Sequence, residues 1–148
     1  YRVHEADWNH FTTAELLADT NRGEATNRSV MPLEKQGVLD LMDGETELAP
    51  GVTAFPTPGH TPGHMSLLVA SKNERALLVG DILGSPMQAT ETDLHYSPDW
   101  DGPMGIAARK NILDQAELTH AVVMGSHLSY PGWGTMIRWE GKRYWKAL

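Results

Sequence analysis

The most constrained segment of the chain is Thr57-Pro58-Gly59-His60-Thr61-Pro62-Gly63-His64. It lies between two short apolar runs, Val52 to Phe55 and Met65 to Ala70, which are typical of strands. Proline fixes φ, and glycine reaches backbone conformations that other residues avoid, so the segment has few conformations to lose on folding. The sequence therefore predicts a stiff loop between strands, and such a loop can aim imidazole rings at a site.

His60 and His64 are four residues apart, but they do not form a helical pair. Pro62 lies between them, and the residue before a proline is pushed toward extended backbone. The two rings therefore need not meet at one ion, and we expect only one of them to bind a metal directly. Taken alone, these residues leave a second interpretation open, in which both are polar loop histidines that make ordinary hydrogen bonds.

Two further strand ends carry side chains that can bind a metal. Asp81 stands directly after a glycine near the end of the apolar run Ala76 to Leu83. A buried carboxylate is costly unless it is paired or bound to a metal, although Asp81 could also cap the following turn. His127 follows a third apolar run, Ala121 to Met124. Three strand ends thus deliver His, Asp and His, which are donors suited to zinc or a similar divalent ion.

This series of motifs resembles a known family of hydrolases. The segment from Thr57 to His64, then Gly80-Asp81, then a strand that ends in His127, looks like the third, fourth and fifth metal motifs of the metallo-β-lactamase fold. The residues from Ser126 to Gly134 are most similar to the lactonase and organophosphate-hydrolase-like branch. The resemblance implies an α/β (α+β) fold, namely half of an αββα sandwich with a mostly antiparallel sheet and flanking helices.

The resemblance also implies a site and a reaction. His60 would bind one metal ion, His127 the other, and Asp81 would bridge them, while His64 would support a ligand. The expected cofactor is a pair of Zn²⁺ ions, with Mn or Fe left open. The implied function is hydrolysis of an ester, lactone or organophosphate bond in a small-molecule substrate by a metal-activated hydroxide.

One departure from the family pattern limits this interpretation. The first signature, His-x-His-x-Asp-His, is absent, and the spacing of His4 and His10 does not replace it. We therefore expect residues 1–148 to be the C-terminal part of a single larger domain whose N-terminal half is missing, and we expect the fragment to be inactive. Two alternatives stay open: a hydroxyacylglutathione-type thioesterase, which would need basic residues such as Arg138, Lys142 and Arg143, and a non-catalytic interaction module.

Composition narrows the range of partners. A net charge of −7 and a pI near 5.4 argue against nucleic acid or an anionic membrane as a partner. The chain has no cysteine, so any metal must be held by histidines and carboxylates. No apolar run reaches the length of a membrane span. We expect a cytoplasmic protein. Because the natural N-terminus is expected to lie upstream of Tyr1, a signal peptide there stays an open alternative.

Periodicity and turn residues predict the remaining elements within one compact unit. We expect a helix from Glu5 to about Asp19, a long loop over residues 20–32 and a helix from Pro103 to Glu117. We also expect three hairpins, which pair Val38–Met42 with Thr46–Leu48 around Asp43-Gly44, Met65–Ala70 with Arg75–Val79, and Thr135–Trp139 with Arg143–Trp145.

Large side chains in an irregular stretch suggest a wall for the site. Residues 84–103 form a long loop that holds His95, Tyr96 and Trp100, and we assign these residues to the substrate pocket together with Trp133. The alternative is a connection that folds back on its own aromatic residues. Trp133, Trp139 and Trp145 are expected in a core or an interface, which leaves a homodimer open.

Overall fold

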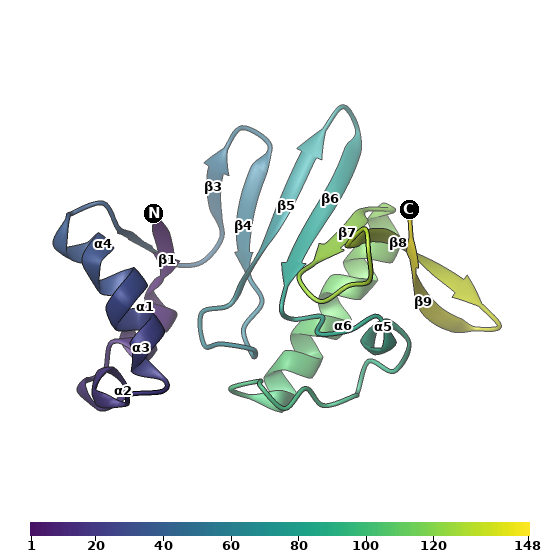
Figure 1. Cartoon of the computed structure of the whole chain (residues 1–148). Helices are drawn as coiled ribbons and strands as arrows, with labels where there is room; N and C mark the ends of the chain where they lie inside the picture. The colour runs from purple at the N-terminus through teal and green to yellow at the C-terminus, as the bar shows by residue number, and fades with distance from the viewer. The chain divides into compact units, whose positions relative to one another are not determined.

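The computed structural model describes residues 1–148, and they form two compact units, Tyr1–Gly44 and Glu45–Leu148 (Figure 1). The expectation of one compact unit is therefore wrong, because the backbone contacts divide at Gly44.

The first unit is a small helical assembly around one pair of strands. Strands β1 (Arg2–His4) and β2 (Asp40–Met42) pair in parallel. His4 caps the first helix, since its Nδ1 accepts a hydrogen bond from the Ala6 N–H at 3.1 Å. The helices between the strands are α1 (Glu5–Phe11), α2 (Ala14–Ala18), α3 (Gly23–Ala25), a π-helical turn (Thr26–Val30) and α4 (Met31–Lys35).

Three predictions fail in this part of the chain. The single helix expected from Glu5 to about Asp19 is two helices, α1 and α2, which are interrupted at Thr12 and Thr13. Residues 20–32 are largely helical, although a loop was expected. The prediction failed because these helices bury no large apolar residue and therefore show no apolar periodicity in the sequence. The hairpin around Asp43-Gly44 is also wrong. Gly44 has the positive φ of a turn, 65°, but β2 pairs with β1 and the following strand pairs within the second unit.

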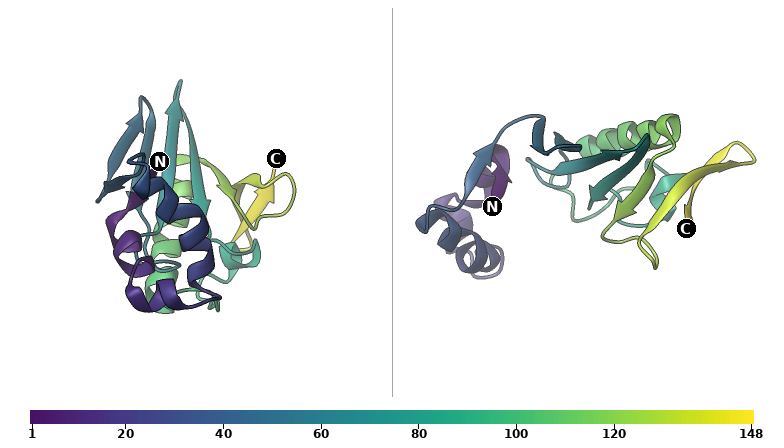
Figure 2. Two further views of the ribbon diagram at one scale, coloured as in Figure 1. Left: turned by 60° about the vertical axis from the view of Figure 1, so that its left-hand side comes forward. Right: turned by 90° about the horizontal axis from the view of Figure 1, so that it is seen from above.

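The second unit is built on one sheet of seven strands that lie in chain order (Figure 1; Figure 2 shows two further views). Every neighbouring pair is antiparallel except β6 and β7, which are parallel. The strands are β3 (Thr46–Ala49), β4 (Val52–Pro56), β5 (Met65–Ser71), β6 (Glu74–Gly80), β7 (Val122–Gly125), β8 (Trp133–Trp139) and β9 (Lys142–Ala147).

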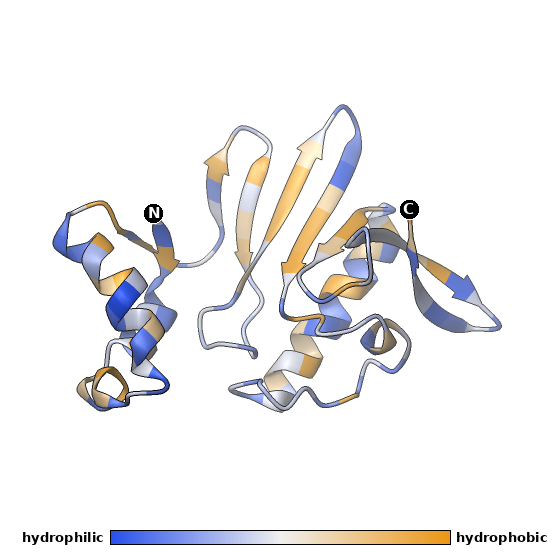
Figure 3. Ribbon diagram, in the orientation of Figure 1, coloured by the Kyte–Doolittle hydropathy of each residue, from blue (hydrophilic) through white to orange (hydrophobic).

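Helix α6 (Gly102–Thr119) connects the two parallel strands and covers one face of the sheet. Asp101 caps it by accepting a hydrogen bond from the Met104 N–H at 2.9 Å, and His120 ends it in the left-handed conformation. Figure 3 shows apolar residues along the central strands and at intervals along α6, and residues of β6, α6 and β7 pack into one core. Its fully buried members include Val79, Leu113 and Val123. No helix in the structure has the length and apolar character that crossing a bilayer requires.

Strand direction brings three chain segments to one edge of this sheet. Strands β4 and β6 are both antiparallel to β5, so they point the same way, and β7 is parallel to β6. The carboxyl ends of these three strands therefore lie together. These are the ends that lead into the loop 57–64, Asp81 and His127, so the topology of the fold itself assembles the candidate site.

The last two strands confirm the predicted C-terminal hairpin. Glu140 and Gly141 turn the chain with φ of 48° and 78°, the positive values of a type I′ turn. Of the three tryptophans expected in a core or an interface, Trp145 packs against the core. Trp133 and Trp139 are 46% and 65% exposed, so they do not belong to the core.

An ion cluster joins this hairpin to the end of α6. Arg138 donates two hydrogen bonds to the Glu117 carboxylate, at 2.7 and 2.9 Å, and Arg143 donates to both Glu117 and Asp114. The hydrogen bonds from Arg138, followed by those from Arg143, lower the pKa of Glu117 below its usual value of 4.5. Since the carboxylate is 20% exposed, solvent screens part of this interaction.

We predict that Glu117→Gln lowers the free energy of unfolding by about 1 kcal/mol at neutral pH. Because the folded-state pKa is depressed, the contribution is present above pH 4.5 and is lost as pH falls through the folded value. Urea unfolding at a series of pH values should therefore show the variant and the wild type converging in acid. Glu74→Gln, at the exposed first residue of β6, is the matched control. A difference that persists in acid would contradict the assignment.

Candidate metal centre

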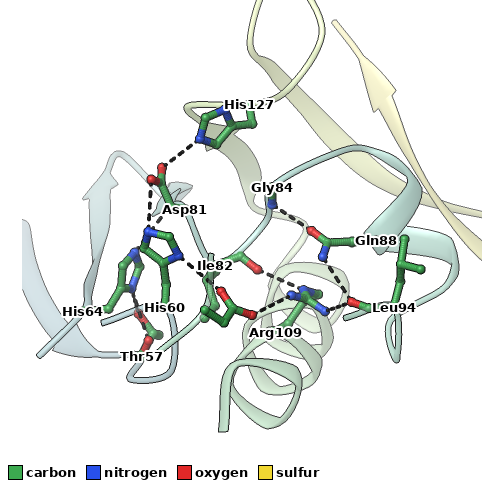
Figure 4. A network of polar contacts seen from close by, with 11 residues as sticks. Thr57, His60, His64, Asp81, Ile82, Gly84, Gln88, Leu94, Arg109 and His127 are labelled. Atoms are coloured by element: carbon green, nitrogen blue, oxygen red, sulfur yellow. Dashed lines mark hydrogen bonds and ion pairs between the residues drawn. The ribbon is translucent and has the colours of Figure 1, made fainter. Parts of the chain in front are cut away.

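The Asp81 carboxylate lies between two imidazole rings (Figure 4). Its Oδ2 is 3.4 Å from His60 Nε2, and its Oδ1 is 3.5 Å from His127 Nε2. The three side chains come from the loop after β4, the end of β6 and the loop after β7. The structure thus brings together the three residues that the sequence predicts as ligands, and each oxygen of Asp81 faces a different histidine.

These two separations are long for hydrogen bonds and suit a shared cation. Charge-assisted N–H···O bonds are typically about 2.7 to 2.9 Å long. Two ligands of one tetrahedral zinc ion, each about 2.0 to 2.1 Å from it, lie roughly 3.3 to 3.4 Å apart. The pairs His60–Asp81 and His127–Asp81 therefore fit two ions, with the carboxylate shared between them.

The other ring nitrogen of His60 strengthens this fit. His60 Nδ1 is 3.2 Å from Asp99 Oδ1, and an ionised carboxylate can only accept, so this contact favours the tautomer that carries its proton on Nδ1. In the neutral ring Nε2 then has a lone pair, and this lone pair faces Asp81 Oδ2. Two electron-pair donors face each other at 3.4 Å, and a bound cation would relieve their repulsion.

Each of these pairs supplies only two donors. No group of three or more His, Cys, Asp or Glu side chains in the chain is arranged to hold one ion. A tetrahedral zinc ion takes four ligands, of which a catalytic site usually draws three from protein. The residues present therefore fit part of a two-metal site, and their roles as ligands stay a prediction.

The ring of His64 contacts the backbone of Asp81 and not its carboxylate. Its Nε2 accepts a hydrogen bond from the Asp81 backbone N–H at 3.3 Å, and its Nδ1 lies 2.8 Å from Thr57 Oγ1 and 3.1 Å from Thr57 O. Gly80 makes room for the ring, since a Cβ there would lie 2.8 Å from His64 Nε2. The structure therefore places His64 where the sequence expects a supporting residue.

A second carboxylate, Asp99, was missed by the sequence interpretation. It lies in the irregular stretch before α6, and its side chain is only 1% exposed. Arg109 of α6 is completely buried nearby, with Nη2 at 3.8 Å from Asp99 Oδ2. Burial lowers the pKa of Arg109, and the charge of Asp99 acts in the opposite direction. The only sequence signal was an arginine among the apolar residues of a predicted helix.

The aromatic residues assigned to the pocket differ in position. The Tyr96 ring stacks on His60 with centroids 5.8 Å apart and lies 6.4 Å from the ring of His127. Gly84 leaves the space that Tyr96 fills, because a Cβ there would lie 2.8 Å from the tyrosine ring. The His95 ring lies against Gly102 at the start of α6, where a Cβ would lie 2.7 Å from it.

Trp100 and Trp133 are both about half exposed, at 52% and 46%. Trp133 lines an open pocket of about 450 Å³ together with Gly80 and Ser126, the chain neighbours of Asp81 and His127. Trp100 donates its backbone N–H to the His60 carbonyl at 3.1 Å. Of the four residues assigned to the pocket, Tyr96 thus lies against the rings of two predicted ligands, and Trp133 lines a pocket next to the chain neighbours of Asp81 and His127.

Known proteins share this sequence pattern. The family model described as the Metallo-beta-lactamase superfamily matches residues 2–129. An N-acyl homoserine lactonase of Bacillus cereus is 41% identical over 114 residues, which cover 77% of this chain and 44% of that protein. The N-acyl homoserine lactonase AiiA of Bacillus thuringiensis subsp. kurstaki is 21% identical over 113 residues, 76% of this chain and 44% of that protein. The chain spans less than half the length of these curated relatives.

Solved structures share the fold. The hydrolase AbOPH in the beta lactamase superfamily superposes with a TM-score of 0.80 at 20% identity, over 97% of this chain and 53% of that one. AidC, a dizinc quorum-quenching lactonase in complex with its product, superposes with a TM-score of 0.73 at 25% identity, over 98% of this chain and 53% of that one. The predicted fold class, half of a metallo-β-lactamase sandwich, is therefore confirmed.

Two independent observations now agree. The family match covers most of the chain, and the fold places the third, fourth and fifth predicted motifs at one sheet edge. The chain therefore belongs to the metallo-β-lactamase superfamily, and its curated relatives include N-acyl homoserine lactonases.

Proposed function

We propose that the protein is a metal-dependent hydrolase of lactones and related esters, and that His60, Asp81 and His127 hold its two metal ions. One observation carries the proposal: the two oxygens of a single carboxylate face the Nε2 atoms of two different histidines, at 3.4 and 3.5 Å. The lactonase similarity at 41% identity and the dizinc lactonase AidC support the choice of substrate and of zinc.

The residues of this chain would position the reaction. A pair of bound divalent ions would activate a water molecule and polarise the scissile carbonyl group. Asp81 would set the spacing of the site, because a shared carboxylate offsets the repulsion between two cations. His64 would hold the Asp81 backbone through its N–H, and Tyr96 would shield one face of the His60 ring from solvent.

The remaining ligands would come from outside these 148 residues. We propose that a His-x-His-x-Asp-His segment upstream of Tyr1 completes the site, since each histidine–Asp81 pair here offers two donors. The curated relatives are more than twice as long as their matched part, which supports this proposal.

The basic residues that the thioesterase alternative requires are already paired with carboxylates of this chain. Arg138 and Arg143 are bound to Glu117, and Lys142 lies 3.2 Å from the Glu91 carboxylate. A glutathione carboxylate would have to displace these partners. The non-catalytic alternative predicts that the protein neither binds zinc nor hydrolyses lactones, so zinc titration and lactone turnover distinguish it from the proposed hydrolase.

Asp81→Ala should abolish lactonase activity in the full-length protein, by about a thousandfold or more, because both ions lose their shared ligand. The measurement is lactone turnover with zinc in excess, together with the zinc content after dialysis. Asp93→Ala, at an exposed position of the 84–103 loop, is the matched control. Wild-type turnover in Asp81→Ala would exclude the bridging role.

His64→Ala should act more mildly, with a loss of roughly 10- to 100-fold, because the ring supports Asp81 through a backbone N–H. We expect the variant to keep two ions at high zinc concentration and to lose one when zinc is limiting. His10→Ala, outside the sheet unit, controls for loss of a histidine. A loss as large as that of Asp81→Ala would contradict this supporting role.

The 148-residue chain alone should bind zinc weakly and show little turnover, whereas the protein extended upstream should bind two ions. Calorimetric titration with zinc of both forms measures the difference. Tight binding of two ions by the 148-residue chain would show that it needs no further ligands and would overturn the proposed division of the site.

A further inference from the structure

Asp99 is the most unusual charged group in the structure. Its side chain is 1% exposed, its Oδ1 lies 3.2 Å from His60 Nδ1, and its Oδ2 has no hydrogen-bond partner. A carboxylate that is buried in this way costs several kcal/mol unless a positive charge or hydrogen bonds compensate it. The nearest cation, Arg109, makes that compensation, although it lies at 3.8 Å and not at hydrogen-bonding distance.

Arg109 is held in place by backbone carbonyls from two segments, the residue after Asp81 and the loop before Asp99. Its Nε donates to the carbonyl of Ile82, the residue after Asp81, at 2.9 Å. Its Nη1 donates to the carbonyls of Thr92 and Leu94, at 3.0 and 2.9 Å. One rigid guanidinium fork thus fixes the backbone beside Asp81 and the loop that carries Asp99 (Figure 4).

The loop is anchored a second time, by Gln88 of the short helix α5 (Met87–Thr90). The buried Gln88 side chain accepts from the Gly84 N–H at 2.8 Å and donates to the Leu94 carbonyl at 3.2 Å. The loop also returns to the histidine loop, since the Asp101 N–H donates to the Gly59 carbonyl at 2.9 Å. Hydrogen bonds thus fix the backbone on both sides of Asp99, at Leu94 and at Asp101, and this places the Asp99 side chain next to His60.

Stability does not explain this pair. A buried ion pair contributes little net free energy relative to apolar side chains of the same size, because both charges are desolvated. The pair also leaves two buried atoms, Asp99 Oδ2 and Arg109 Nη2, without hydrogen bonds. The Asp99–Arg109 pair thus costs desolvation free energy, and Asp99 contacts the predicted ligand His60. We therefore look for its role in the site and not in stability.

We propose that Asp99 is a positioning residue that fixes the plane and the tautomer of His60, and that Arg109 holds Asp99 in place. With Nδ1 protonated toward Asp99, His60 presents the lone pair of Nε2 toward Asp81 Oδ2. This inference rests on the proposed function, since it gives His60 the role of a metal ligand.

The geometry makes the effect selective. Asp99 contacts His60, whereas His127 faces the opposite oxygen of Asp81 and is 45% exposed. Loss of Asp99 should therefore weaken the ion at His60 and leave the ion at His127 nearly unchanged. A role in folding alone would weaken both ions equally.

The first test needs no metal. In the metal-free chain at alkaline pH, where imidazoles are neutral, ¹⁵N NMR correlation spectra report which ring nitrogen carries the proton. We expect His60 to be protonated on Nδ1 in the wild type and partly on Nε2 in Asp99→Asn, because an asparagine amide can donate to Nδ1. A wild-type His60 that is protonated on Nε2 would overturn the proposal even if no variant folds.

The second test is zinc titration of the full-length protein with a competing chelator. Asp99→Asn should bind one of its two ions roughly 10- to 100-fold more weakly and the other as the wild type does. Asp93→Asn, in the same loop and paired with Lys110 at 2.6 Å, should match the wild type. Equal weakening of both ions, or unchanged binding of both with an unchanged tautomer, would overturn the positioning role.

The two tests separate this inference from the proposed function. A wild-type protein that binds no zinc would overturn the metal-dependent hydrolase and, with it, the role of His60 as a ligand. Two zinc ions with lactone turnover, combined with a His60 ring that Asp99→Asn does not affect, would retain the hydrolase and reject the positioning role.

Discussion

The structure of the site depends on the contact of one carboxylate with two imidazoles, at 3.4 and 3.5 Å. Asp81 can occupy this position because β6 ends in Gly80, whose φ of 54° turns the chain out of the sheet and whose missing Cβ leaves space for His64. The sheet order then determines which side chains it meets, since β4 and β7 run in the same direction as β6. Strand topology and one glycine thus account for most of the geometry.

Much of this site could be predicted from sequence because its residues follow regular strands. Asp81 and His127 follow apolar runs that are unmistakable as strands, and the proline and glycine spacing around His60 restricts its loop. The long helix α6 was predicted for the same reason, from its apolar period and its proline in the first turn. Regular elements with buried faces leave a pattern in the sequence, and residues at their ends can be placed from it.

The parts that could not be predicted depend on contacts between residues far apart in the chain. Asp99 acts through His60, 39 residues away, and through Arg109, whose burial no local pattern indicates. The predictions for the first unit failed for a different reason. Its helices over residues 23–35 bury no large apolar side chain, and β2 pairs with β1 instead of with the strand nearest in sequence. Gly44 has the positive φ that a hairpin turn needs, but a turn residue alone does not specify which strands pair.

The buried guanidinium of Arg109 has a consequence for how such a site could diversify. It fixes the carbonyls of Thr92 and Leu94, and Gln88 fixes Gly84, so the backbone from Gly84 to Leu94 has little freedom to change length. Insertions there would move the whole loop away from its anchors. New specificity would instead arise from exchanging surface side chains on an unchanged frame, and the half-exposed Trp133, which lines the pocket beside Gly80 and Ser126, is the natural place to begin.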